Sequence, residues 1–107
     1  MDTDGGGAYL WVTIDEQASP RRVIARGDLD AGSAGALAEQ LDRAATGAAD
    51  VALDLGEVRF IDSSGLRSLI EVARRSEAEG FAFRVVAASE PVQRVFDLTG
   101  TSFLLGP

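Results

Sequence analysis

From residue 21 onward, short apolar runs alternate with stretches whose apolar residues recur at helical spacing, and this alternation constrains the fold more than any other feature. Three segments are typical of strands: residues 21–29, the VALDL run that opens 49–62, and residues 81–87. Each is followed by a stretch of helical periodicity. Strands that alternate with helices predict an α/β layer with a largely parallel sheet and helices packed against it.

The three predicted helices have recognisable ends. Asp30 or Ser33 can cap the helix predicted within 30–47. The clearest amphipathic pattern follows the serines of FIDSSG, and Gly80 is placed to end that helix. The third helix is predicted over 89–100, because a serine followed by Glu-Pro is a good helix start and a glycine closes the segment.

The N-terminal part precedes this alternation. Residues 8–15 alternate between apolar and other side chains, as a strand does, and a short turn at 16–20 links them to 21–29. The short link predicts an antiparallel hairpin, so the sheet is expected to be mixed. Residues 1–7, MDTDGGG, are predicted to be a disordered tail. The segment 101–105 is predicted to form a last short strand or a packing tail.

Composition excludes many functions. The 107 residues fit one domain, predicted over 8–107, and contain neither cysteine nor histidine, so thiol chemistry and the usual general base are absent. The net charge of −7, with arginine as the only basic residue, disfavours nucleic-acid and anionic-membrane partners. No apolar run approaches the ~20 residues of a membrane span, and no signal peptide is recognisable. We therefore expect a cytoplasmic protein without a cofactor or a dedicated metal site.

The stretch FIDSSGLRS (60–68) joins a predicted strand to a predicted helix. A second strand-to-helix loop, GDLDAGS (27–33), is expected to share the same rim of the sheet, since a short right-handed crossover brings both loops to one edge. The polar residues of the two loops would then be neighbours. They are Asp28, Asp30, Asp62, Ser63 and Ser64.

Two interpretations of this rim remain open from the residues alone. Ser63 or Asp62 can simply cap the following helix, which is worth ~1 kcal/mol. Alternatively, a serine hydroxyl at a helix start is accessible to a kinase, and the free amides there tolerate an added phosphate. Arg67, one turn along, can pair with Asp62, contact a partner or compensate a phosphate on Ser63.

The stretch DLGEVRFIDSSGLRSLI (54–70) resembles the signature of the STAS domain, specifically that of the free-standing bacterial anti-sigma factor antagonists. RGDLDAGSAGAL (26–37) is similar to the family's segment before the first helix, and VQRVFDLTG (92–100) resembles its closing element. The 81–87 strand matches in position, so the resemblance covers nearly the whole chain. Arg67 stands where the sporulation-type members have a glycine.

The resemblance implies a non-enzymatic partner switch. An unphosphorylated antagonist binds an anti-sigma factor that is also an ATP-dependent serine kinase, and the sigma factor is released. Phosphorylation of the first serine after the motif aspartate, here Ser63, ends the binding, and a PP2C-type phosphatase reverses it. The family surface that contacts the kinase is thereby expected to include six residues: Asp28, Asp30, Asp62, Ser64, Gly65 and Arg67.

Two other functions are compatible with these residues. A STAS module can act as a docking or adaptor subunit of a transporter or stress-signalling complex without being phosphorylated. A small-ligand or nucleotide site on the same rim is the weaker hypothesis, because the chain has no lysine and no phosphate-binding loop. The sigma factor, the kinase, the signal and the oligomeric state are not specified by the sequence.

Overall fold

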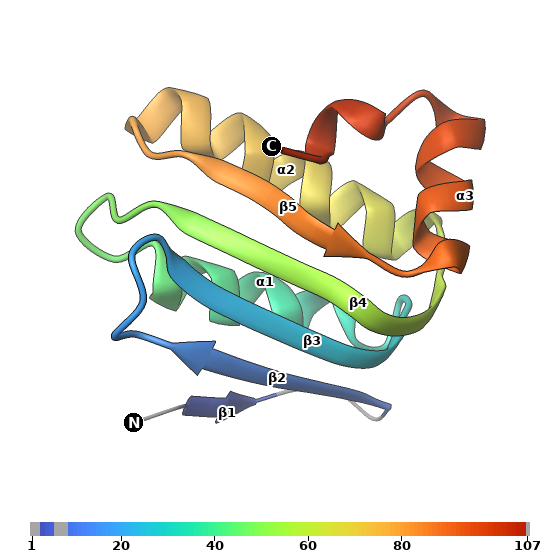
Figure 1. Cartoon of the computed structure of the whole chain (residues 1–107), viewed down its shortest axis with the longest axis horizontal. Coiled ribbons are helices and arrows are strands. Elements are labelled where there is room, and N and C mark those ends of the chain that lie inside the picture. Colours follow the sequence, from blue (N-terminus) through green and yellow to red (C-terminus); the bar gives the residue numbers. More distant parts are fainter. Residues whose placement is uncertain (1–2, 6–8, 107) are drawn as a thin grey trace.

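The computed structural model describes residues 3–5 and 9–106 (Figure 1). The strands are β1 (Thr3–Gly5), β2 (Leu10–Asp15), β3 (Arg21–Leu29), β4 (Val51–Ile61) and β5 (Phe83–Ala88). The helices are α1 (Ala34–Ala44), α2 (Ser63–Glu79), α3 (Glu90–Thr99) and the short 3-10 helix η1 (Ser102–Leu104). Within the described residues, the predicted alternation of strands and helices is therefore confirmed.

The five strands form one mixed sheet in the order β1-β2-β3-β4-β5. The pairs β1–β2 and β2–β3 are antiparallel, and the pairs β3–β4 and β4–β5 are parallel, so the predicted N-terminal hairpin and mixed sheet are confirmed. The strand β1 lies inside residues 1–7, where a disordered tail was expected. It forms because the outer edge of β2 offers backbone hydrogen-bonding groups, with which an extended segment can pair whatever its side chains. The other residues of the expected tail lie outside the described part.

One face of the sheet carries the core. Side chains alternate along β2, where Leu10, Val12 and Ile14 are buried and the residues between them are more exposed. Both α1 and α2 lie against this face, and α3 stands beside the end of the sheet (Figure 1). The buried side chains of all these elements, including Phe96 of α3, join a single apolar cluster. This burial gives the main driving force for folding.

The ends of α2 and α3 follow the sequence prediction. Gly80 ends α2 in the left-handed conformation with φ of +80°, and Gly100 ends α3 with φ of +69°. Ser89 caps α3 by accepting a hydrogen bond from the Val92 amide at 3.4 Å. The first helix is shorter than the predicted 30–47, because a turn at Asp30 occupies its expected first residues.

Arg75 of α2 ties α2 to α1. Its guanidinium forms a hydrogen bond with the Asp42 carboxylate of α1, and its Nε lies 3.3 Å from a Glu79 carboxylate oxygen one turn along. The hydrogen bond to Asp42, followed by that to Glu79, raises the pKa of Arg75 above its ordinary value. Because these side chains are about half exposed, the ion pairs contribute at most about 1 kcal/mol to stability.

The C-terminal segment resolves the open alternative for 101–105. It forms η1 and then a single parallel bridge between Leu105 and Val85, with the Gly106 amide donating to the Val85 carbonyl at 3.0 Å. Leu104 is buried in the core. The segment therefore acts mainly as a packing tail against the outer edge of β5.

Candidate functional site

The two polar loops meet at one edge of the sheet. β3 and β4 are parallel neighbours, and their last residues, Leu29 and Ile61, are paired in register. The Asp62 amide donates a hydrogen bond to the Leu29 carbonyl at 3.1 Å, which joins the start of one loop to the start of the other. The prediction that both loops share a rim is confirmed. We call the residues of 28–33 and 62–67 the rim.

Asp62 is the residue that caps α2. Its backbone is extended, with φ of −111° and ψ of −175°, and its Oδ1 accepts a hydrogen bond from the Gly65 amide at 3.0 Å. The Leu66 amide donates to the Asp62 carbonyl at 3.0 Å, which closes the first helical turn. A carboxylate here also favours the positive end of the helix. Of the two capping candidates, the structure therefore selects Asp62.

Ser63 is the first residue of α2, and its side chain is exposed. Among the residues that the structure describes, its hydroxyl has no hydrogen-bond partner. The first amides of a helix have no intrahelical acceptor, so unsatisfied donors lie close to this hydroxyl. Ser64, by contrast, is half-buried and lines a shallow hollow between α1 and α2. The two serines therefore differ clearly in accessibility.

Gly65 allows α2 to approach β3 closely. A Cβ atom at this position would lie 2.7 Å from both the Cγ and the carbonyl oxygen of Leu29, and 3.2 Å from Cγ1 of Ile61. Any larger residue would push the helix start away from the sheet. Gly65 is also buried in this structure, and its expected contact with a partner stays a prediction. What the structure shows is that Gly65 lets the start of α2 lie close to the sheet.

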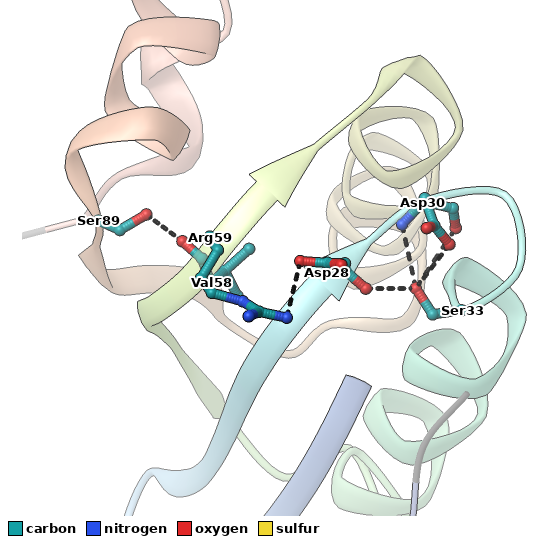
Figure 2. A network of polar contacts seen from close by, with 6 residues as sticks. All are labelled: Asp28, Asp30, Ser33, Val58, Arg59 and Ser89. Carbon is teal, nitrogen blue, oxygen red and sulfur yellow. Dashed lines mark hydrogen bonds and ion pairs between the residues drawn. The ribbon is translucent and has the colours of Figure 1, made fainter. Parts of the chain in front are cut away.

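The other loop is held together by a buried serine (Figure 2). Ser33 is 1% exposed, and its Oγ donates to the Asp28 carbonyl at 2.8 Å while accepting from the Asp30 amide at 3.0 Å. The Asp30 carboxylate accepts from the Gly32 amide at 2.9 Å, which closes a tight turn. Ser33 is the N-cap residue of α1, which confirms one of the two predicted caps, but neither its side chain nor that of Asp30 makes a capping hydrogen bond to the helix. Their hydrogen bonds shape the loop instead.

Asp28 and Asp30 are both half-buried on the rim. The carboxylate of Asp28 forms an ion pair with Arg59 of β4, with 3.3 Å between Oδ1 and the guanidinium nitrogen (Figure 2). Next to Arg59, the Val58 carbonyl accepts a hydrogen bond from the Ser89 hydroxyl at the start of α3. Sequence reasoning missed Arg59, because Asp28 and Arg59 become neighbours only through the β3–β4 register.

Arg67 is exposed and separates two shallow hollows on α2. One hollow, of about 380 Å³, is lined by Ser63, Leu66, Arg67, Ile70, Glu71 and Arg74. The other lies between α1 and α2 and includes Ser64. Within residues 3–5 and 9–106, Arg67 forms no ion pair, so the possible pairing with Asp62 does not occur in this structure. Its guanidinium lies free beside the exposed serine.

The described residues offer little for catalysis. No group of three or more acidic side chains in that part of the chain is arranged to hold a metal ion. No described helix is long and apolar enough to cross a membrane. The rim instead presents one exposed hydroxyl among capping and turn-forming carboxylates. The described part of the chain is thus an α/β domain whose polar side chains gather on a surface rim beside the ends of β3 and β4.

The chain belongs to the STAS domain family, which matches residues 13–106. It is 29% identical over 89 residues to the anti-sigma-B factor antagonist of Bacillus subtilis (strain 168), covering 83% of this chain and 82% of that protein. This relative belongs to a non-enzymatic group of proteins. The predicted membership of the STAS family is therefore confirmed, and the resemblance to anti-sigma factor antagonists is confirmed by a relative of moderate identity.

Two solved structures share the fold. The unphosphorylated form of the anti-sigma factor antagonist SpoIIAA is similar with a TM-score of 0.70 and 20% identity, over 89% of this chain and 85% of that one. The phosphorylated form of the Bacillus cell fate determinant SpoIIAA is similar with a TM-score of 0.65 and 19% identity, over 89% and 88% of the two chains. At these identities the likeness establishes the architecture alone.

Proposed function

We propose that this protein is an anti-sigma factor antagonist that is switched off by phosphorylation of Ser63. In the unphosphorylated form its rim binds an anti-sigma factor that is also an ATP-dependent serine kinase, and the sigma factor is released in the cytoplasm. The kinase transfers the γ-phosphoryl group of ATP to the Ser63 hydroxyl oxygen: the bond to the β-phosphate oxygen breaks, ADP leaves, and the hydroxyl loses its proton. A PP2C-type phosphatase hydrolyses the phosphate ester and restores the binding form.

The exposed Ser63 hydroxyl is the observation that carries this proposal. It stands at the first position of α2, directly after the Asp62 cap, and no described group competes for it. Ser64, its half-buried neighbour, is the less accessible acceptor. The names of the relatives, which include an unphosphorylated and a phosphorylated antagonist, support a phosphorylation switch in this family.

The switch requires no change of fold. Phosphorylation adds about −1.5 to −2 charges at neutral pH. On a rim that already carries Asp28, Asp30 and Asp62, this charge would have to be desolvated against the partner, which costs several kcal/mol. Each ~1.4 kcal/mol lowers affinity tenfold, so two or three such increments suffice to end binding. The carboxylates of the rim thus raise the electrostatic cost of the phosphorylated complex.

Phosphate transfer in an extract of the native cells tests the acceptor. The parent protein, Ser63→Ala and Ser64→Ala are incubated with ATP, and the phosphate is located by mass spectrometry. We expect label on the parent and on Ser64→Ala but none on Ser63→Ala. If only Ser64→Ala lacks the label, the phosphorylated residue is Ser64 rather than Ser63. An absence of label in an extract with active serine kinases would favour the docking-subunit alternative.

Binding to the captured kinase tests the switch itself. Ser63→Ala should bind as tightly as the parent, because the substitution removes only an exposed hydroxyl that has no described partner. Ser63→Asp should bind at least about tenfold more weakly, since it introduces a charge into the contact. Equal affinity of Ser63→Asp and the parent would rule out the electrostatic mechanism. Co-purification of a transporter subunit in place of a kinase would instead support the adaptor function.

A further inference from the structure

The sheet has a second face that neither α1 nor α2 covers, since both of these helices lie on the opposite side (Figure 1). We call the outward-pointing side chains of residue 9 and of β2, β3, β4 and β5 the open face. Tyr9 is 64% exposed, Trp11 58% and Phe60 50%. Ile24 and Val86 add apolar surface between and beside them. Three of the seven aromatic residues of the chain therefore lie on this face in contact with solvent.

The charges of the open face are balanced. The strand pairing places Asp15 beside Arg22 and Arg26 beside Glu57. Two ion pairs cross the same strands, Arg22 with Asp54 and Arg59 with Asp28. Together with Arg84 of β5, the face carries four arginines and four carboxylates, of which one, Asp28, also belongs to the rim. The entire net charge of −7 therefore belongs to the rest of the chain.

We propose that the open face is the surface through which two copies of this chain associate. A strongly charged partner would be attracted to a face with an excess of the opposite charge, and the open face has no excess of either sign. A neutral face does not repel a second copy of itself, and in a two-fold symmetric contact the carboxylates of one copy are available as partners for the arginines of the other. The remaining surface, with its excess of carboxylates, repels a second copy. Among the surfaces of the described residues, the open face alone is both neutral and rich in exposed aromatic side chains.

The size of the face indicates a weak, reversible dimer. The area of the open face follows from the sheet geometry. Its four strands lie about 4.8 Å apart, and each has roughly eight residues at about 3.3 Å per residue, which gives on the order of 500 Å² in each copy. The total is near 1,000 Å², at the low end of specific protein–protein interfaces. We therefore expect a dissociation constant in the micromolar range or weaker rather than an obligate dimer.

This contact leaves the rim serine accessible. Ser63 begins α2, which packs on the opposite face of the sheet, so a dimer would present the two copies of Ser63 on its outer sides (Figure 1). The inference does not depend on the proposed antagonist function. A dimer would carry two rims. A partner that is itself two-fold symmetric would bind it more tightly, because binding of the first rim raises the effective concentration of the second.

The sole tryptophan of the chain, Trp11, reports on the contact directly. Sedimentation velocity of the parent protein from about 1 μM to about 1 mM should show a monomer–dimer equilibrium. Over the same range the Trp11 emission should shift to the blue and become less accessible to acrylamide. A monomer at every concentration, or a dimer in which the Trp11 emission is unchanged, would overturn the proposal.

Two variants and a matched control locate the interface. Trp11→Ser removes the central aromatic side chain, and Arg26→Glu gives the face a net negative charge; each should raise the dimer dissociation constant about tenfold or more. Phe103→Ser is the control, because Phe103 is 67% exposed on η1, away from the open face. Equal weakening by Phe103→Ser would overturn the proposal. Since Arg26 is exposed, Arg26→Glu tests the face even if Trp11→Ser fails to fold.

Discussion

The carboxylate of Asp62 accepts a hydrogen bond from the Gly65 amide at 3.0 Å, and this contact releases the intervening Ser63 side chain to solvent. A capping residue lies outside the helix, whereas the next residue is the first with helical geometry. If Ser63 had been the cap, its hydroxyl would have been occupied by a backbone amide. The identity of the cap therefore decides which hydroxyl of the D-S-S-G stretch is available for modification.

Replacing Asp62 separates its capping role from its charge. Asp62→Ala should lower the free energy of unfolding by about 1 kcal/mol, because the Gly65 amide loses its acceptor. Asp62→Asn should retain most of the stability, since asparagine caps helices about as well as aspartate. Urea denaturation measures both. A loss in Asp62→Asn as large as that in Asp62→Ala would show that the charge, rather than the hydrogen bond, stabilises the helix start.

The close approach at Gly65 predicts a large cost for a single methyl group. Gly65→Ala should destabilise the fold by about 1–3 kcal/mol, because the new Cβ would overlap the Leu29 carbonyl oxygen. Gly35→Ala is the matched control: Gly35 lies in α1 with no atom within 4 Å of the added Cβ. There alanine should stabilise by a few tenths to about 1 kcal/mol. Thermal or urea unfolding in which the two variants behave alike would contradict this account of α2 packing.

Ser33 is predicted to hold the shape of the Asp28–Asp30 segment. Ser33→Ala removes a buried hydroxyl and leaves the Asp30 amide without its acceptor, which should cost about 1–3 kcal/mol. Amide hydrogen exchange at Asp30 should become faster than in the parent. Ser102→Ala, which removes an exposed hydroxyl bonded to Asp97, should change stability by less than about 0.5 kcal/mol. Unchanged exchange at Asp30 would contradict the role given to Ser33.

Arg67 is predicted to interact with a phosphate on Ser63. The two residues are four apart and line the same hollow, with the anion nearer the helix N-terminus, the favourable order for such a pair. A cation stabilises the dianion, so the second pKa of the phosphate should be lower in the parent than in Arg67→Gln. Phosphoserine installed at position 63 during synthesis and titrated by ³¹P NMR should show a difference of about 0.2–0.4 pH units.

The control for that titration is Arg74→Gln. Arg74 lines the same hollow but is eleven residues from Ser63, about 16 Å along the helix. Its replacement should leave the phosphate pKa close to that of the parent. Equal shifts in the two arginine variants would mean that the general positive charge of α2, rather than a specific pair, acts on the phosphate.

Short sequence motifs predicted the ends of the helices well where the residue type itself favours the local backbone structure. Gly80 and Gly100 end their helices because only glycine adopts the left-handed conformation without strain, and Ser89 caps α3 because its hydroxyl reaches an amide three residues on. For Ser33 the same local reasoning gave the right N-cap residue of α1 but not the hydrogen-bond partners of the Ser33 hydroxyl. Its hydroxyl has two competing backbone neighbours in the Asp28–Asp30 segment, and only the folded loop selects between them and the helix cap.

The sequence by itself determined the alternation of strands and helices, the shared rim and the family, because periodicity and short motifs are properties of neighbouring residues. Only the tertiary structure decided that Asp62 is the cap, that Gly65 is buried against Leu29, and that Asp28 pairs with Arg59. It also decided which sheet face stays open around Trp11. These outcomes depend on strand register and on close packing between residues distant in the chain, which no local pattern specifies.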